Sequence, residues 1–537
     1  MIVLGLHGGV TINQHEPGAS LSIDGKIVAI CEEERYLRMK NAYGYLPFRA
    51  IKACLKIANI RFEDIELVVA PGITYDFFAD RIRHHLNHHF GSCPRIELVH
   101  HQMAHLAAAF YGSGMEEAMC LSLDASGDGL CGMYGHATRK DGIKVIEKIA
   151  NRQSIGYFYT LMTFYLGFSD GDEYKLMGLA PFGEPTVDLS RIIRPIQGGW
   201  DFAWEYIRSD PPSKSPFEPI YSEKIQDVLG QPARRPDAPL TQFHKDVARS
   251  TQATFEACLL NLIADMKKRM PGQRNLCYGG GVALNCAANR LLLYSGDFDN
   301  IYISPVASDR GIALGCAYLG AVKEGDSPWP LYDPYQGSSY SNDQIRNELV
   351  SNGIAFTEVD DPAEAGGRLI ADDKIIGWYQ GRSEAGARAL GNRSILASAR
   401  DEKMRDMVNA RIKYREEFRP FAPSVLGEEA ETWFRTGGQD HPFMCFAVDA
   451  QESKAKQIGA VVHQDGTSRV QTVRSSNNEL YYALIRQYAK EKGIPLILNT
   501  SFNLKGQPIV ETPRDAIMTF FGCGLDALVM GNFLVKK

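Results

Sequence analysis

Two histidines one helical turn apart could bind the same metal ion. His101 and His105 stand at positions i and i+4, and on a helix this spacing places both imidazoles on one face. Asp124 ends an apolar stretch typical of a buried strand, and Asp309 begins a helical pattern after another strand. Strand ends are where α/β proteins place ligands, and imidazoles with carboxylates suit iron, zinc or manganese. These four residues are therefore our candidates for a divalent metal site.

The histidine spacing also has a simpler interpretation. An i, i+4 pair is often only the polar face of a helix, and the run Arg83–His89 contains such pairs as well. No glycine loop with a carboxylate accompanies that run, so we expect it to form a solvated helix or loop.

Two glycine-containing loops after predicted strands could let a nucleotide approach the backbone. Glycine allows close approach, and a helix start offers free N–H groups. Neither loop has the Walker or the EF-hand pattern, so a tight turn is the alternative interpretation of both. The residues concerned are Gly279, Gly280, Gly281 and Asn285 in one loop and Gly127, Asp128 and Gly129 in the other.

Positive charge gathers around the loops of the C-terminal third. Arginine binds phosphate oxygens in a bidentate manner, so the clustering favours phosphate binding over surface ion pairs with acids such as Glu416 and Glu417. The candidate residues are Arg388, Arg393, Lys413, Arg415, Arg419 and Arg469, followed by Asn499 and Ser501 after the apolar stretch Ile494–Leu498.

The composition argues against several functions. The 537 residues include 58 basic and 64 acidic ones, a net charge of -6, which disfavours a general nucleic-acid coat. The 11 cysteines include no C-x-x-C pair, so neither a disulfide framework nor a cysteine zinc site is expected. We see no secretory signal and no apolar run long enough to span a bilayer. We expect a cytoplasmic protein that binds neither membranes nor nucleic acids.

A pattern of strand, polar loop and hairpin occurs twice. The first copy begins with Ile2–Leu6 and turns at Asp24-Gly25, and the second begins with Ala118–Leu123 and turns at Asp141-Gly142. Asp-Gly favours a tight hairpin turn. An internally duplicated α/β fold is therefore expected. After a Pro- and Gly-rich linker at 324–341, the remaining chain is expected to form its own α/β domain.

Taken together and in order, these strings resemble the NodU/CmcH carbamoyltransferases, a family that includes the tobramycin carbamoyltransferase. The resemblance covers nearly the whole chain. It implies a duplicated ASKHA (actin/hexokinase-like) domain of the TsaD type over residues 1–335 and a YrdC-like α/β domain over 336–537. The matching strings are Glu32–Arg35, His101–His105, Asp124–Gly129, Tyr174–Pro181, Gly279–Asn285, Asp309–Gly315, Arg388–Ser394, Arg419–Ser424 and Asn499–Asn503.

The resemblance also implies roles for individual residues. Iron, as Fe²⁺, would be bound by His101, His105, Asp124 and Asp309, and His15 would be the catalytic histidine. Where the family commonly has His-Asp-Ala-Ser, this chain reads His15-Glu16-Pro17-Gly18-Ala19-Ser20. The implied carbamoyl-adenylate contacts are Lys40 and the residues of the two glycine loops. The implied contacts to ATP and carbamoyl phosphate are Arg388, Arg393, Lys413, Arg419, Arg469, Asn499 and Ser501.

The implied activity is ATP-dependent transfer of a carbamoyl group. Carbamoyl phosphate would be converted to carbamoyl-adenylate with ATP and Mg²⁺, and the group would then pass to a hydroxyl of a small molecule. The acceptor is open: an aminoglycoside, another sugar, a cephem or other antibiotic precursor, or a guanidinium toxin would fit, as would an amine. A homodimer is our expectation.

The sequence leaves four alternative functions. A tRNA threonylcarbamoyl transferase of the TsaD class would need a basic surface and no adenylating domain. An ASKHA sugar or acetate kinase would need neither histidine of the pair. The hydrogenase-maturation carbamoyltransferase carries cysteine zinc motifs that this chain lacks. A non-catalytic binding protein would release no pyrophosphate.

Overall fold

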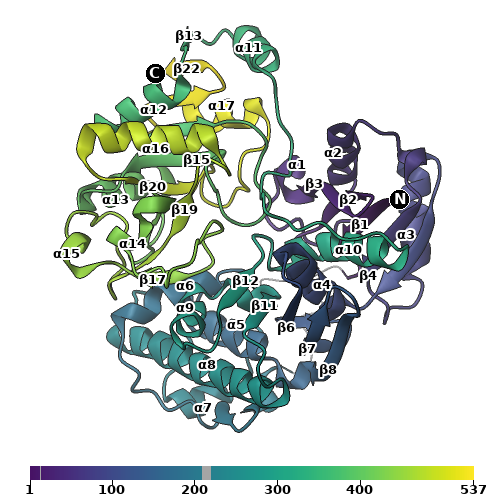
Figure 1. Ribbon diagram of the computed structural model, residues 1–537. Coiled ribbons are helices and arrows are strands. Elements are labelled where there is room, and N and C mark those ends of the chain that lie inside the picture. The colour runs from purple at the N-terminus through teal and green to yellow at the C-terminus, as the bar shows by residue number, and fades with distance from the viewer. Residues whose placement is uncertain (12–13, 209–218) are drawn as a thin grey trace.

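The computed structural model describes residues 1–11, 14–208 and 219–537, which form the three lobes seen in Figure 1. The first lobe is built on a five-stranded sheet of order β3-β2-β1-β4-β5. Strands β1 to β3 are antiparallel, whereas β4 and β5 run parallel to β1. The strands are β1 (Ile2–His7), β2 (Gly18–Ile23), β3 (Lys26–Glu32), β4 (Leu67–Pro71) and β5 (Arg95–Val99).

The second lobe repeats this topology. Its sheet has the order β12-β11-β6-β7-β8, with an antiparallel meander from β6 and two parallel strands on the other side. The strands are β6 (Glu117–Gly127), β7 (Leu130–Thr138), β8 (Gly142–Ala150), β11 (Asn275–Gly279) and β12 (Asn300–Ile303). Each sheet therefore has its first strand at the centre, which confirms the predicted duplicated, ASKHA-like α/β fold.

Two helices, α4 (His101–Ser113) and α10 (Ile312–Lys323), pack against each other and connect the two sheets. Their close approach requires glycine, because a Cβ at Gly315 would lie 1.9 Å from the carbonyl oxygen of Ala104. This packing brings the start of α10, and with it Asp309, next to the histidines of α4.

The other helices of the first two lobes cover the sheets or connect the strands. They are α1 (Glu33–Leu37), α2 (Arg49–Ala58), α3 (Phe78–Phe90), α5 (Ile155–Tyr165), α6 (Glu173–Leu179), α7 (Ile225–Leu229), α8 (Gln242–Arg269) and α9 (Cys286–Tyr294), with a two-stranded sheet of β9 (Ile193–Ile196) and β10 (Gly199–Phe202). The histidine-rich run Arg83–His89 lies in α3, whose apolar face is buried through Phe78, Ile82 and Leu86.

The glycine loop at 279–285 leads into a helix only after a short turn. A 3-10 turn occupies Gly281–Leu284, and α9 starts at Cys286. The reason is local, because the side chain of Asn285 accepts a hydrogen bond from the Ala288 backbone N–H and caps the helix there.

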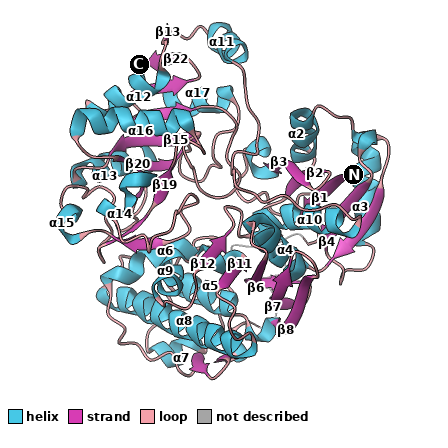
Figure 2. Ribbon diagram, viewed as in Figure 1, coloured by secondary structure: helices cyan, strands magenta, loops and turns pink. Residues whose placement is uncertain are grey.

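The C-terminal lobe is an eight-stranded mixed sheet of order β13-β22-β21-β14-β15-β20-β16-β19. Helices α12 and α16 lie together beside it (Figure 2). The strands are β13 (Thr357–Glu358), β14 (Ile376–Tyr379), β15 (Arg393–Ser398), β16 (Ala422–Leu426), β19 (Gln471–Val473), β20 (Leu496–Ser501), β21 (Ala527–Met530) and β22 (Phe533–Lys536), with a separate pair of β17 (Ala447–Asp449) and β18 (Thr467–Arg469). The helices are α11 (Asn342–Ser351), α12 (Pro362–Ala371), α13 (Glu402–Val408), α14 (Ala430–Trp433), α15 (Glu452–Ala455), α16 (Glu479–Lys492) and α17 (Pro513–Phe521).

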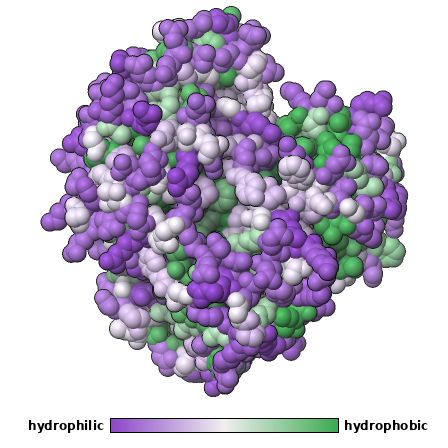
Figure 3. Space-filling view, in the orientation of Figure 1, coloured by the Kyte–Doolittle hydropathy of each residue, from purple (hydrophilic) through white to green (hydrophobic). Residues whose placement is uncertain are grey.

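The second lobe and the C-terminal lobe share an apolar core, since their buried residues form one cluster. The face seen in Figure 3 is hollowed near its centre, where the lobes meet. Within residues 1–11, 14–208 and 219–537, none of the helices has both the length and the hydropathy that crossing a bilayer requires.

Candidate metal centre and arginine pocket

The four predicted metal ligands come together at the junction of the first two lobes. Nε2 of His101 and Nε2 of His105 lie 3.2 and 3.1 Å from Oδ2 of Asp124. Oδ1 of Asp309 lies 3.4 and 3.5 Å from the same nitrogens. One potential ligand atom from each residue lies within 4.8 Å of the others, so this metal cluster could hold an ion.

The electrostatics of the metal cluster fit a cation. Burial alone would lower the pKa of His101, but the carboxylates of Asp309 and Asp124 outweigh burial and raise it to about 10. Burial opposes ionisation of Asp309, yet the His101 charge and hydrogen bonds from the histidines hold its pKa well below its usual range. Two buried carboxylates thus need positive charge, and a divalent ion would supply it while both imidazoles bind in their neutral form.

Neighbouring residues hold His101 in place. A Cβ at Gly127 would lie 2.1 Å from Cδ2 of His101, so only glycine fits. The Asp128 carboxylate accepts hydrogen bonds from the His101 backbone N–H at 2.7 Å and from the Gly72 N–H at 3.0 Å. Asp128 and Gly129 have positive φ angles and form the turn between β6 and β7. The predicted nucleotide loop Gly127–Gly129 therefore anchors the start of α4.

His7 belongs to the same site, although the sequence analysis assigned it no role. Its Nε2 lies 3.2 Å from Oδ2 of Asp309 and 3.2 Å from the carbonyl oxygen of His15. The duplication could have revealed it. His7 follows the strand residues Ile2–Leu6 just as Asp124 follows Ala118–Leu123.

His15 lies on the loop before β2, with its side chain 41% exposed. Burial would lower its pKa, but the charges of Glu16 and Asp309 outweigh burial and raise it to about 9. Glu16, where the family pattern differs, has φ of 58°. It accepts a hydrogen bond from Oγ of Ser308 at 2.7 Å and forms an ion pair with Arg310. Glu16 thereby links the His15 loop to the residue next to Asp309.

The loop Gly279–Asn285 runs beside Asp124. Gly280 has φ of +88°, and a Cβ there would lie 2.0 Å from the carbonyl oxygen of Leu123. A Cβ at Gly281 would lie 3.0 Å from Oδ1 of Asp124. The side chain of Asn285 is paired with Gln252 through two hydrogen bonds of 3.1 Å. The loop thus lies against the metal cluster and leads into α9.

A second site, which we call the arginine pocket, lies between the C-terminal lobe and the second lobe. It is a cavity of about 170 Å³. The C-terminal lobe contributes most of the polar side chains and the second lobe one wall. The lining includes Arg388, Arg415, Arg419, Arg469, Asn499 and Ser501 from the former and Tyr174, Met177, Gly178, Cys286 and Ala287 from the latter.

The lining of the arginine pocket carries an excess of positive charge, since it includes four arginines and, among the described residues, one carboxylate, that of Asp465. Arg419 forms an ion pair with Glu416 at 3.4 Å, whereas among the described residues no carboxylate forms an ion pair with Arg388, Arg415 or Arg469. Burial and the neighbouring Arg469 charge lower the pKa of Arg388 to about 9. Burying like charges together is costly unless an anion balances them, so the pocket is suited to an anionic ligand.

Three other predicted contacts lie outside the lining of this pocket. Arg393 donates to the carbonyl oxygens of Asn392 and Ser338 at 3.0 and 3.1 Å and stacks 3.8 Å over the ring of Tyr379. Lys413 donates to the side-chain oxygen of Asn503 at 2.8 Å. Arg393 and Lys413 thus stabilise loops around the pocket. Lys40 is exposed, with Nζ 5.8 Å from the ring of Tyr174, which does line the pocket.

Comparison with known proteins identifies the family. Residues 74–318 match the family model of the carbamoyltransferase N-terminus, and residues 367–537 match that of the carbamoyltransferase C-terminus. The chain therefore belongs to the carbamoyltransferase family and is a transferase enzyme.

Two relatives are similar over most of this chain. It is 36% identical to the nodulation protein NolNO of Sinorhizobium fredii, over 100% of this chain and 83% of that protein. It is 39% identical to the nodulation protein NolO of Bradyrhizobium diazoefficiens, over 82% of this chain and 79% of that protein. The crystal structure of T. kodakarensis HypF aligns with a TM-score of 0.33 and 11% identity, over 60% of this chain and 47% of that one, which is too distant to carry functional information.

Proposed function

We propose that this carbamoyltransferase works in two steps, through a carbamoyl-adenylate, and delivers the carbamoyl group to a hydroxyl of a small molecule. The observation that carries the proposal is the arginine pocket, where the half-buried side chains of Arg388, Arg415 and Arg469 lie together. Among the described residues, no carboxylate forms an ion pair with any of the three. A pocket of this charge suits a polyphosphate and a carbamoyl donor.

The first step would take place in the arginine pocket. Carbamoyl phosphate loses its phosphate to water, the resulting carbamate attacks the α-phosphorus of ATP, and pyrophosphate leaves with Mg²⁺. Arg388, Arg419 and Arg469 would offset the negative charge that develops on the phosphates. Asn499 and Ser501 line the same cavity at the end of β20 and would orient the donor.

The second step would take place at the metal cluster. A bound metal, which we propose to be Fe²⁺, would act there as a Lewis acid. His15 would take the proton from the acceptor hydroxyl as that oxygen attacks the carbamoyl carbon, and AMP would leave. Since Asp309 and Asp124 contribute to the raised pKa of His15, a divalent cation beside them would lower that pKa and favour the neutral imidazole that a general base requires.

A two-part assay tests this proposal. We expect the protein to release pyrophosphate only when ATP and carbamoyl phosphate are both present. His15→Asn should keep this partial reaction while losing transfer to an accepted substrate by about 100-fold or more. Formation of ADP instead of AMP and pyrophosphate would favour a kinase. Undiminished transfer by His15→Asn would remove His15 from the mechanism.

A further inference from the structure

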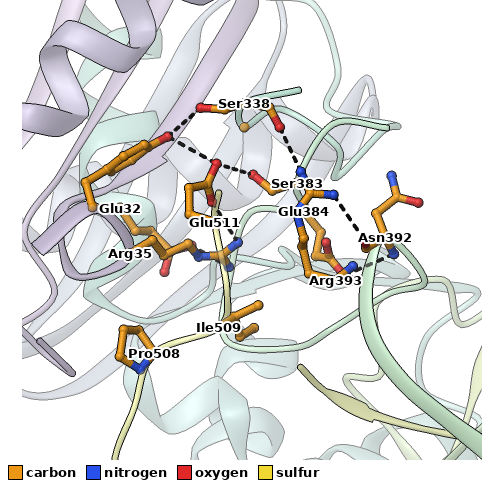
Figure 4. Close-up of polar contacts among 12 residues, drawn as sticks. Glu32, Arg35, Ser338, Ser383, Glu384, Asn392, Arg393, Pro508, Ile509 and Glu511 are labelled. Carbon is orange, nitrogen blue, oxygen red and sulfur yellow. Dashed lines mark hydrogen bonds and ion pairs between the residues drawn. The ribbon is translucent and has the colours of Figure 1, made fainter. Parts of the chain in front are cut away.

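The loop that carries Arg388 is anchored in two different lobes. This bridging loop, residues 380–392, connects β14 to β15. Its base is held within the C-terminal lobe, because Oε1 of Glu384 accepts hydrogen bonds from the N–H groups of Leu390 and Arg393 at 2.6 and 3.3 Å. Oε1 of Glu511 accepts a further one from Oγ of Ser383 at 3.0 Å (Figure 4).

The tip of the bridging loop is bound by the first lobe. The Gly386 N–H donates to Oε1 of Glu32 at 2.6 Å, and the Gly386 carbonyl oxygen accepts from the Arg35 guanidinium at 2.7 Å. Gly386 has φ of +102°, and a Cβ there would lie 2.1 Å from the carbonyl oxygen of Pro305. Both backbone polar groups of Gly386, two residues before Arg388, are therefore bound by side chains of the first lobe.

The carboxylate of Glu32 is also connected to the metal cluster, through Arg310. Oε2 of Glu32 accepts from Nε of Arg310 at 2.9 Å, and Arg310 directly follows Asp309. Arg310 also pairs with Glu16, the neighbour of His15. Glu32 is 4% exposed and Arg310 is 8% exposed, so solvent screens these interactions little. A continuous buried chain of contacts thus joins the proposed transfer site to the loop of Arg388.

We propose that Glu32 is a positioning residue that sets Arg388 in the arginine pocket from the side of the transfer site. This inference rests on the two-step function proposed above. Loss of the carboxylate charge leaves the positive charges of Arg310 and Arg35 less well neutralised and weakens the hydrogen bond from the Gly386 N–H. Because these groups are buried, losing their partner destabilises the local structure strongly. The loop tip then moves, and Arg388 loses its place relative to the donor phosphates.

A matched pair of variants tests the inference. Glu32→Gln preserves the shape of the side chain and removes its charge. The control is Glu33→Gln, because Glu33 is similarly buried. Within the described part of the chain, its carboxylate accepts hydrogen bonds only from N–H groups at the start of α2, such as that of Ala50 at 2.7 Å. In acceptor-free pyrophosphate release, we expect Glu32→Gln to lower kcat/KM for carbamoyl phosphate by about 10-fold or more and Glu33→Gln by less than about 3-fold.

A double-mutant cycle separates positioning from general loss of structure. If Glu32 acts through Arg388, then Glu32→Gln should cost less than about 3-fold in an Arg388→Ala background. Equal effects of the two glutamine variants, or effects of Glu32→Gln and Arg388→Ala that multiply, would overturn the inference. A wild-type protein that releases no pyrophosphate would instead refute the proposed function.

A second variant covers the case in which Glu32→Gln fails to fold. Arg35→Lys keeps the positive charge but removes the guanidinium that reaches the Gly386 carbonyl oxygen. It should lower kcat/KM for carbamoyl phosphate in the same way and show the same dependence on Arg388. Wild-type kinetics of Arg35→Lys would count against the anchoring of the loop tip.

Discussion

At the scale of single residues, the metal cluster depends on side chains that neutralise one another. His105 is 1% exposed, and its Nε2 lies within 3.5 Å of oxygens from both Asp124 and Asp309. Among the histidines of the described chain, those of α3 provide a contrast, because His88 is exposed and lies on the polar face of its helix.

Replacing His105 should therefore empty the metal site without affecting the arginine pocket. We expect His105→Asn to reduce bound metal by at least about 10-fold, since one of four ligands is lost, while pyrophosphate release stays within about 2-fold of wild type. Elemental analysis of the purified protein measures the first and a coupled assay the second. His88→Asn is the control and should retain its metal, and a fully metallated His105→Asn protein would contradict the assignment.

At the scale of elements, α5 and α6 meet through the half-buried carboxyl group of Glu173. Oγ1 of Thr160 in α5 donates to Oε1 of Glu173 at the start of α6 at 2.8 Å. Burial and the nearby Asp170 charge raise the pKa of Glu173 to about 7. The folded protein thus favours the protonated form, so Glu173 contributes stability at low pH that is lost as the pH rises from about 4.5 to about 7.

Glu173→Gln, which mimics the protonated acid, should remove this pH dependence. Relative to wild type, the variant should gain on the order of 1–3 kcal/mol of stability at pH 7.5 and little at pH 4.5. Thermal unfolding followed at both pH values measures the difference, and Glu184→Gln at an exposed position serves as the control. A gain that is the same at both pH values would show that the carboxyl group does not titrate in this range.

At the scale of the whole molecule, the arginine pocket exists only because two lobes close on each other. The arginines come from the C-terminal lobe, whereas α6 and the start of α9 supply the opposite wall through Met177, Cys286 and Ala287. The activity proposed for the C-terminal lobe should therefore respond to substitutions in the second lobe.

Met177→Trp tests this dependence. The larger side chain should partly fill a cavity of about 170 Å³ and lower kcat/KM for ATP in pyrophosphate release by about 10-fold, although no residue of the C-terminal lobe changes. Met39→Trp, at a position that is 46% exposed, is the matched control. Steady-state kinetics of both variants would show whether the second-lobe side of the arginine pocket affects ATP use. The same kcat/KM for ATP in both variants would argue against a pocket shared by the two lobes.

Much of this architecture could be predicted from the sequence, because it depends on local patterns. The apolar stretches and the Asp-Gly turns predicted the first strand and the hairpin of each repeat. The i, i+4 spacing of His101 and His105 and the strand-end positions of the aspartates made these residues candidates for one metal site, and the family resemblance implied that all four bind the same ion. The clustering of arginines in the C-terminal loops likewise predicted an anion-binding site in this part of the chain.

Tertiary structure alone decided how side chains that are distant along the chain pair with one another. The sequence separation between Glu32 and Gly386 is 354 residues, and no local pattern encodes their contact. Arg393 and Arg388 look alike in sequence, yet Arg393 is bound to backbone carbonyls and Arg388 lines the pocket. His7 joins the metal cluster only because the packing of α10 against β1 brings Asp309 to it. Orientation and partner choice depend on the closed packing of the lobes, which only the folded chain provides.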